Sequence, residues 1–278
     1  MDQTTLEQLL VDLPLGLIRY FDRIDSTNLE ASRLSSNGAP DLSLVVADEQ
    51  TAGRGRAGRQ WLSPPGMGLS FSLISRSIGQ VQLISGQEIA RFTALGAVAV
   101  CGVLQDKYGI DALIKWPNDV LIDENKVAGI LAEAHWMDDR PETIVIGVGV
   151  NVSPGSVPPD NSISYPATCV EDHLDLSPRD AAGGDLPRLV NRWDLLLELI
   201  SRMIVWRKKL MRDEFISTWE GKLAYIGEIV QLQVIASPTN PRIGRIKGLG
   251  MDGSLALEDG EGNINYVFAG DVSLRRIR

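Results

Sequence analysis

The chain has 278 residues, of which 44% are hydrophobic, enough to bury a core without a disulfide or metal. Its length fits one large domain or a large domain with a small one. With 27 Lys and Arg against 36 Asp and Glu, the net charge is −9, which argues against bulk nucleic-acid binding. The two cysteines and two histidines lack the spacing of a zinc site, so we expect inert thiols.

The N-terminal residues lack the basic and apolar pattern of an export signal, and no run of 18 apolar residues occurs. We therefore expect a cytoplasmic protein that contacts no membrane. Residues 1–23 hold one short apolar stretch, interrupted by Pro14, too little for a helix-turn-helix domain. We accordingly expect no operator-DNA binding.

Hydrophobic patterning predicts a mixed α/β domain over residues 1–222 and a small β-barrel over 223–278. In the first domain we expect a helix from Ser26–Asn28 to Leu34, strands at 42–47 and 68–75, and a long helix at 85–108 ended by Gly109. Short strands follow at 112–116, 120–122, 127–136 and 143–152.

A proline-rich stretch at 153–187 predicts loops and one short helix, and the chain is expected to return to helix over 186–222. The core face of this helical region is expected to consist of Leu189, Trp193, Leu196, Leu197 and Ile200. The barrel is expected to contain strands at 229–235, 244–249, 255–257 and 264–268, with turns at Asp252-Gly253 and Asp259-Gly260.

The most informative segment is a glycine- and arginine-rich loop, Gln50 to Trp61, which we call the Gly/Arg loop. It carries three glycines at 53, 55 and 58 and three arginines at 54, 56 and 59. Such a loop suits a phosphorylated ligand, since guanidinium groups and free backbone N–H groups bind phosphate oxygens. The alternative interpretation is a solvated, flexible loop.

The same glycines match the dinucleotide fingerprint Gly-x-Gly-x-x-Gly, but their context does not. That fingerprint needs a strand running directly into the first glycine and a helix beginning at the last. Here Asp48–Gln50 precede the loop, and Ser63–Gly66, with two prolines, prevent a helix. We reject a dinucleotide site, and no phosphate-binding loop of the Gly-Lys-Ser/Thr type occurs either.

Two further segments carry polar residues beside short strands. In Lys115–Asp119, Pro117 fixes a turn that aims Asn118 and Asp119, a pair suited to Mg²⁺ or an incoming amine. Lys126 opens a strand of small and apolar residues, where a partly buried lysine would face a phosphate or a developing oxyanion. The alternatives are a self-capped turn and a surface lysine.

Taken together, these segments, with Asp25–Asn28 and Gly147–Asn151, resemble the biotin protein ligase family in order and spacing from about residue 20 onward. The resemblance implies an α/β catalytic domain related to class II aminoacyl-tRNA synthetases, followed by an SH3-like barrel. It also implies that biotin and ATP form biotinyl-5′-AMP, with Mg²⁺. The biotinyl group then passes to a lysine of the biotin carboxyl carrier domain of acetyl-CoA carboxylase.

The resemblance also implies roles for individual residues. Those expected to bind biotin are Ser26, Thr27, Asn28, Gln50, Gly53, Arg54, Gly55, Arg56, Lys126, Gly129, Leu131 and Gly149. Those expected to bind the nucleotide are Arg56, Trp61, Asn118, Asn151 and Arg275. Catalysis is expected of Arg54, Arg56, Asp119 and Lys126, with Asp119 also the metal ligand. The assembly is expected to be a monomer or homodimer.

One departure concerns the barrel, where a lysine of some family members is replaced by Gln231. This puts a phosphate contact from that strand in doubt. Two other functions compete: a lipoate or octanoyl ligase of the same fold, and an arginine-rich RNA-binding module. The Gly/Arg loop disfavours the first, while the acidic net charge and the lack of interleaved aromatic residues disfavour the second.

Overall fold

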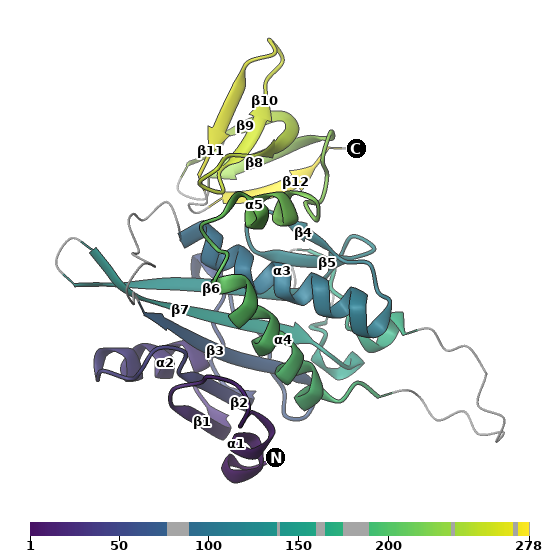
Figure 1. The fold of residues 1–278 in the computed structure, drawn as a ribbon. Helices are drawn as coiled ribbons and strands as arrows, with labels where there is room; N and C mark the ends of the chain where they lie inside the picture. The colour runs from purple at the N-terminus through teal and green to yellow at the C-terminus, as the bar shows by residue number, and fades with distance from the viewer. Residues whose placement is uncertain are drawn as a thin grey trace, which may run out of the picture.

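A computed structural model describes residues 1–76, 89–137, 140–159, 165–174, 189–234, 237–268 and 272–277. Its main element is a seven-stranded sheet of order β1-β2-β3-β7-β6-β5-β4 (Figure 1). The strands are β1 (Ile18–Ile24), β2 (Leu44–Gln50), β3 (Gly68–Arg76), β4 (Leu113–Lys115), β5 (Asp119–Ile122), β6 (Asn125–Met137) and β7 (Arg140–Asn151). β1 pairs with β2 in parallel, and all other neighbours are antiparallel. The expected mixed α/β fold is confirmed.

Helices cover the two faces of this sheet unequally. One face is packed by α3 (Ile89–Tyr108) and α4 (Arg192–Arg207), seen in front of the sheet in Figure 1. The other face carries α2 (Thr27–Ser36), whose Ala31 packs against Val45 and Val145. Because side chains alternate along a strand, the neighbouring Leu44 and Ile146 join the core under α3. Beyond α2, this second face is open to a cavity.

The long helix α3 is a core helix. Its length and composition would suit a membrane span, but its most apolar window is 78% buried inside the fold. Phe92 and Leu95 are fully buried on it. It ends at Gly109, whose φ of +70° is the left-handed conformation that glycine adopts readily. The expected residues 85–88 lie outside the described residues.

The N-terminus holds two elements that the sequence did not predict, α1 (Gln3–Leu9) and the edge strand β1. Asp2 caps α1 by accepting from the Thr5 N–H at 2.8 Å. The Gln3 side chain binds the outer edge of β1, donating to Ile18 O and accepting from Tyr20 N. β1 is half exposed and therefore carries polar residues. Its sequence lacks the apolar pattern that would predict a strand.

The region predicted to be helical, 186–222, contains two helices. They are α4 and α5 (Asp213–Glu220), separated by turns at 208–212. Asn191 caps α4, accepting from the N–H groups of Trp193 and Asp194. Leu189 precedes this cap and is 74% exposed, so its assignment to the core face was wrong.

The C-terminal part of the chain forms a second, antiparallel sheet of order β11-β10-β9-β8-β12, consistent with the expected SH3-like barrel. Its strands are β8 (Ile229–Val234), β9 (Ser237–Leu249), β10 (Leu255–Glu258), β11 (Ile264–Val267) and β12 (Val272–Arg276). The last of these was not predicted. The turn after Asp259 takes its positive φ at Gly262 rather than at Gly260. The expected boundary at 222/223 falls between α5 and β8.

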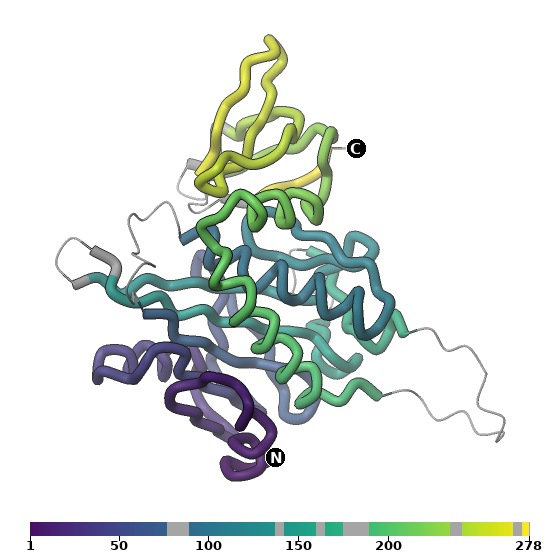
Figure 2. The backbone as a smooth tube through the Cα atoms, viewed as in Figure 1, coloured from purple at the N-terminus to yellow at the C-terminus, as the bar shows by residue number. Residues whose placement is uncertain are grey.

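The barrel sits on the end of the first sheet, above α5 in Figures 1 and 2. The two domains share buried contacts. The indole Nε1 of Trp116 donates to Gly253 O at 3.1 Å, and the backbone N–H of Leu249 donates to Glu220 Oε1 at 2.8 Å. Trp219 packs closely against Gly253, where any Cβ would stand 2.7 Å from its ring. Trp116 is 1% exposed, so this junction is part of the core.

We expect Trp116→Phe to lower the free energy of unfolding by about 1–3 kcal/mol, because the buried Gly253 carbonyl loses its donor and a small cavity opens. Urea denaturation measures this. The matched control is Trp136→Phe, at a tryptophan 52% exposed on β6, where we expect a change below about 0.5 kcal/mol. Equal effects of the two substitutions would contradict the proposed contribution of the domain junction.

Candidate active site

A cavity of about 590 Å³ opens on the sheet face that carries α2. Its floor is formed by Gly129 and Leu131 of β6 and by Gly147 and Gly149 of β7, which stand opposite one another in register. The Gly/Arg loop covers it. The start of α2, the turn between β4 and β5, and Arg275 of β12 complete its walls. The cavity therefore joins segments from both domains.

The glycines of the floor leave room for the side chains above them. A Cβ on Gly147 would lie 2.0 Å from Asn28 Oδ1, and a Cβ on Gly149 would lie 2.3 Å from the Trp61 ring. Both distances are far shorter than van der Waals contact. Trp61 thus packs directly on the backbone of β7, and any side chain at position 149 would displace it.

At the α2 end of the cavity, neutral polar groups form a buried network. Gln50 Oε1 accepts from both the backbone N–H and the hydroxyl of Thr27, at 2.8 and 3.1 Å. The fully buried Ser72 hydroxyl lies 2.8 Å from Thr27 Oγ1 and 2.6 Å from Asn28 Oδ1. Because each group is held by its neighbours, this end presents fixed donors and acceptors without net charge.

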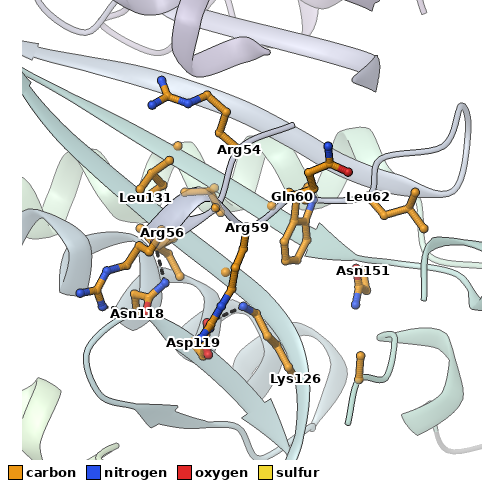
Figure 3. A pocket seen from close by; sticks show the side chains of 18 of the residues that line it. Arg54, Arg56, Arg59, Gln60, Leu62, Asn118, Asp119, Lys126, Leu131 and Asn151 are labelled. Atoms are coloured by element: carbon orange, nitrogen blue, oxygen red, sulfur yellow. Dashed lines mark hydrogen bonds and ion pairs between the residues drawn. The ribbon is translucent and has the colours of Figure 1, made fainter. Parts of the chain in front are cut away.

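The network continues to the Gly/Arg loop through a carboxylate on β6. Asn28 Nδ2 donates to Glu133 Oε2 at 2.8 Å and to Leu131 O at 3.2 Å. Glu133 in turn forms an ion pair with Arg54 at 3.0 Å. The first arginine of the loop is therefore fixed to the sheet rather than to the cavity centre, and Figure 3 shows it pointing away from Asp119.

At the opposite end, the turn between β4 and β5 meets the start of β6. Lys126 Nζ lies 2.5 Å from Asp119 Oδ1. Arg56 donates to Asn118 Oδ1 at 3.1 Å, and Asn118 Nδ2 donates to Ile130 O at 3.1 Å. These pairs are the dashed contacts of Figure 3. An arginine of the loop is thus linked to the strand end that carries the only carboxylate among the described lining residues.

Positive charge dominates this second end. The basic residues that line this end are Arg56, Arg59, Lys115, Lys126 and Arg275, whereas Arg54 is paired with Glu133 near the other end. Burial lowers the pKa of the Lys115 ammonium to about 8; Asp119 opposes this shift, and Lys126, Arg59 and Arg275 add to it. Such a cluster of cations around one carboxylate favours an anionic ligand such as a polyphosphate.

The Gly/Arg loop is a tight hairpin-like turn. Gly55 N donates to Arg59 O at 2.7 Å and Trp61 N donates to Gly53 O at 2.8 Å. Ala57 and Gly58 both have positive φ, +53° and +71°. No α-helix begins at Gly58; residues 56–58 form a tight turn with left-handed backbone at Ala57, which confirms the rejection of a dinucleotide fingerprint.

The structure brings almost all sequence-predicted site residues to this cavity. Gly53 alone does not line it; a Cβ there would stand 2.4 Å from Trp61 O, so its role is to let the loop close. Asn151 is 3% exposed and donates to Thr168 O at 3.0 Å. The roles assigned to these residues remain predictions.

Sequence reasoning missed several residues around the cavity: Ser72, Lys115, Glu133, Arg59 and Tyr165. Lys115 and Arg59 lay within the segments already singled out, so their charge was the available signal. Ser72 and Glu133 are polar residues on buried strands, and their alternation with apolar neighbours was the signal for them. Tyr165 gave none, because it follows a proline-rich loop.

Asp119 is the residue that a metal would use. Among the described residues no group of three or more His, Cys, Asp or Glu side chains gathers to hold an ion. One carboxylate beside one amide oxygen fits Mg²⁺, which takes most of its ligands from water and substrate phosphates. The site therefore suits an ion that arrives with a polyphosphate, not a resident one.

Comparison with known proteins gives consistent matches. The model of the family described as Biotin/lipoate A/B protein ligase matches residues 20–151. The chain is 34% identical over 262 residues to the bifunctional ligase/repressor BirA of Bacillus subtilis, covering 92% of this chain and 73% of that protein. It is 32% identical over 286 residues to the biotin–[acetyl-CoA-carboxylase] ligase of Mycobacterium tuberculosis, covering 98% and 95%.

A solved structure agrees with these matches. The biotin protein ligase from Aquifex aeolicus in complex with biotin and ATP superposes with a TM-score of 0.73, at 28% identity, over 94% of this chain and 99% of that chain. The resemblance inferred from the sequence motifs is confirmed.

We expect Gly149→Ala to displace the Trp61 indole from β7, because the added Cβ cannot share its space. The fluorescence of Trp61, taken as the difference from the same variant carrying Trp61→Phe, should shift in wavelength. Gly260→Ala is the control, since its Cβ meets nothing within 4 Å. An unchanged Trp61 spectrum in Gly149→Ala would show that the ring does not rest on the strand.

Proposed function

The chain belongs to the biotin/lipoate A/B protein ligase family, and we propose that it is an ATP-dependent biotin ligase. Biotin and ATP would form biotinyl-5′-AMP and pyrophosphate; the biotinyl group would then pass to a lysine amine, releasing AMP. One observation carries this proposal: a single cavity has a neutral, hydrogen-bonding end and a cationic end, with the Gly/Arg loop across both. The names of the similar proteins from Mycobacterium tuberculosis and Aquifex aeolicus support it.

The neutral end suits the ureido head of biotin. A urea group offers two N–H donors and one carbonyl acceptor, and it carries no charge. Thr27, Asn28 and Gln50 supply amide and hydroxyl groups fixed by mutual hydrogen bonds. Gly129, Leu131 and Gly149 present no polar side chain, so the wall that they form together with the Trp61 ring suits the bicyclic ring and the aliphatic tail.

The cationic end suits the reaction between two anions. The biotin carboxylate must attack the α-phosphorus of ATP, so neutralising and aligning negative charge lowers the barrier. Arg56 and Lys126 stand where the tail would end, beside Asn118 and Asp119. When an anion enters, the Lys126 ammonium can turn from Asp119 toward it. Asp119 is then free to accept a proton from the acceptor lysine in the second step.

Mg²⁺ bound to the triphosphate would neutralise charge on the leaving pyrophosphate. Asp119 is the residue that would hold it. The acceptor that fits this chemistry is the biotin carrier domain of acetyl-CoA carboxylase, because relatives are named for that reaction. A cytoplasmic location remains part of the proposal, supported by the two buried cysteines, which are free thiols as is usual in a reducing compartment.

The direct test is biotin-dependent release of pyrophosphate from ATP. We expect release with biotin and none with lipoate or octanoate, followed by transfer of labelled biotin to a carrier domain. Release with lipoate alone would favour the lipoate ligase alternative, and release with none of these acids would reject an acyl-adenylating enzyme.

We expect Arg56→Ala to slow adenylation by about two to three orders of magnitude, the cost of removing one charge-assisted contact in a water-excluded site. The variant should also release biotinyl-AMP, measured as biotinylation of bystander lysines on an unrelated protein. Arg33→Ala, on the exposed side of α2, is the control. An Arg56→Ala variant that keeps full adenylation activity and releases no biotinyl-AMP would contradict the role proposed for Arg56.

We expect Arg275→Ala to raise the KM for ATP in adenylation and to leave single-turnover transfer from biotinyl-AMP nearly unchanged. Arg275 lines the cavity, and its partner across the strands is the uncharged Gln231, so the barrel offers one cation there. Gln231→Lys should tighten ATP binding modestly. Asp271, a possible surface partner of Arg275, lies outside the described residues. Equal slowing of both half-reactions would argue against a phosphate contact.

A further inference from the structure

Lys115 is a buried lysine that forms no ion pair with any carboxylate of the described residues. Its side chain lies at the cationic end of the cavity, and the residue is 7% exposed. Among the described residues it forms no ion pair, because the nearby Asp119 is paired with Lys126. Its ammonium instead rests on the ring of Tyr165, with Nζ 3.4 Å from the ring centroid. A cation held on an aromatic face and facing a cavity still offers its N–H donors to a ligand.

The ring that carries Lys115 is fixed from the other domain. The hydroxyls of Tyr165 and Tyr225 share a hydrogen bond of 2.6 Å. Tyr225 belongs to the linker between α5 and the barrel, and its φ of +65° is in the left-handed region. A bulky residue in that conformation is unusual and is kept only where the surroundings require it. Here it directs the side chain toward Tyr165.

The same linker is bound to the strand of Lys115. Ile114 N donates to Lys222 O at 2.7 Å, and Ala224 N donates to Ile114 O at 2.9 Å. The linker thus pairs with β4 at the residue just before Lys115 and reaches its ammonium again through the tyrosines. The guanidinium of Arg276, on β12, lies 6.0 Å from the Tyr225 ring. Backbone and side-chain contacts of the interdomain segment therefore converge on one lysine.

We infer that Lys115 binds the triphosphate of the nucleotide and that the Tyr165–Tyr225 pair is a positioning device that holds it there. This inference rests on the proposed function. It adds that the linker, through Tyr225, makes the affinity for ATP depend on contacts with the barrel. Phosphate oxygens would supply the anionic partner that Lys115 lacks among the described residues. The neutral end of the cavity is separate, so the device should not affect biotin.

The test uses conservative variants of the full chain. Tyr165→Phe and Tyr225→Phe each remove the shared hydrogen bond while retaining the ring. Each should raise the KM for ATP in pyrophosphate release roughly 2- to 12-fold, the equivalent of one hydrogen bond, with the KM for biotin unchanged. Because both delete the same bond, the double variant should be no worse than either single one. Tyr266→Phe, at an exposed tyrosine of β11, is the matched control.

Substitutions of the lysine complete the test. Lys115→Met should raise the KM for ATP more than either tyrosine variant, and Lys115→Arg should recover part of the loss. Additive tyrosine effects, a parallel rise in the KM for biotin, or tyrosine variants indistinguishable from Tyr266→Phe would overturn the inference. So would Lys115→Met with an unchanged KM for ATP.

Calorimetric binding of pyrophosphate separates this inference from the proposed function. Lys115→Met should weaken that binding even if the wild-type chain adenylates no acid, in which case only the biotin ligase proposal fails. Wild-type and Lys115→Met chains that bind pyrophosphate equally would overturn the inference while leaving the ligase proposal intact.

Discussion

The site depends on the absence of side chains at three positions of two paired strands. Gly129 and Gly149 face one another across β6 and β7, and Gly147 stands two residues from Gly149. A Cβ at 147 or 149 would strike Asn28 or Trp61, and one at 129 would crowd Trp61 and Lys126. Glycine is normally unfavourable inside a strand, because it has no side chain to pack and loses more conformational entropy on folding than other residues. The sheet accepts that cost where the side chains of Asn28, Trp61 and Lys126 lie against its backbone, and α3 and α4 supply the compensating core on the opposite face.

The two ends of the cavity above this floor differ in polarity. The neutral end is built from residues whose hydrogen bonds close on one another, so it binds by shape and complementary donors. At the cationic end, the carboxylate of Asp119 partly neutralises the positive charge through its short ion pair with Lys126. Under the proposed function, this pair holds the base, Asp119, beside the cation, Lys126, until an anionic substrate separates them. The proposed function thus has one set of residues bind the uncharged part of the substrate and another set act on its charged part.

Much of this arrangement could be predicted from the sequence, and the failures have physical causes. Gly, Pro and Arg at fixed spacing mark loops and strand ends whatever the tertiary context, so the Gly/Arg loop, Asn118–Asp119 and Lys126 were found. The local pattern marks Ser72 and Glu133 only as polar residues on buried strands, because their partners, Asn28 and Arg54, lie far along the chain. Leu189 followed the helical periodicity, yet the Asn191 cap began the helix two residues later. The edge strand β1 is half polar, because only one neighbour covers it, and so lacked a strand signature.

The contacts of Gln3 and of the interdomain linker have a consequence for solubility. An open sheet has two outer strands whose free N–H and C=O groups invite another chain to pair with them. On the outer side of β1, the side-chain amide of Gln3 donates to Ile18 O and accepts from Tyr20 N, as the backbone of a neighbouring strand would. The outer side of β4 is occupied by the linker at Ile114. Both margins of the sheet are thus blocked where a foreign strand would begin to pair, so a segment that connects two domains also guards against aggregation.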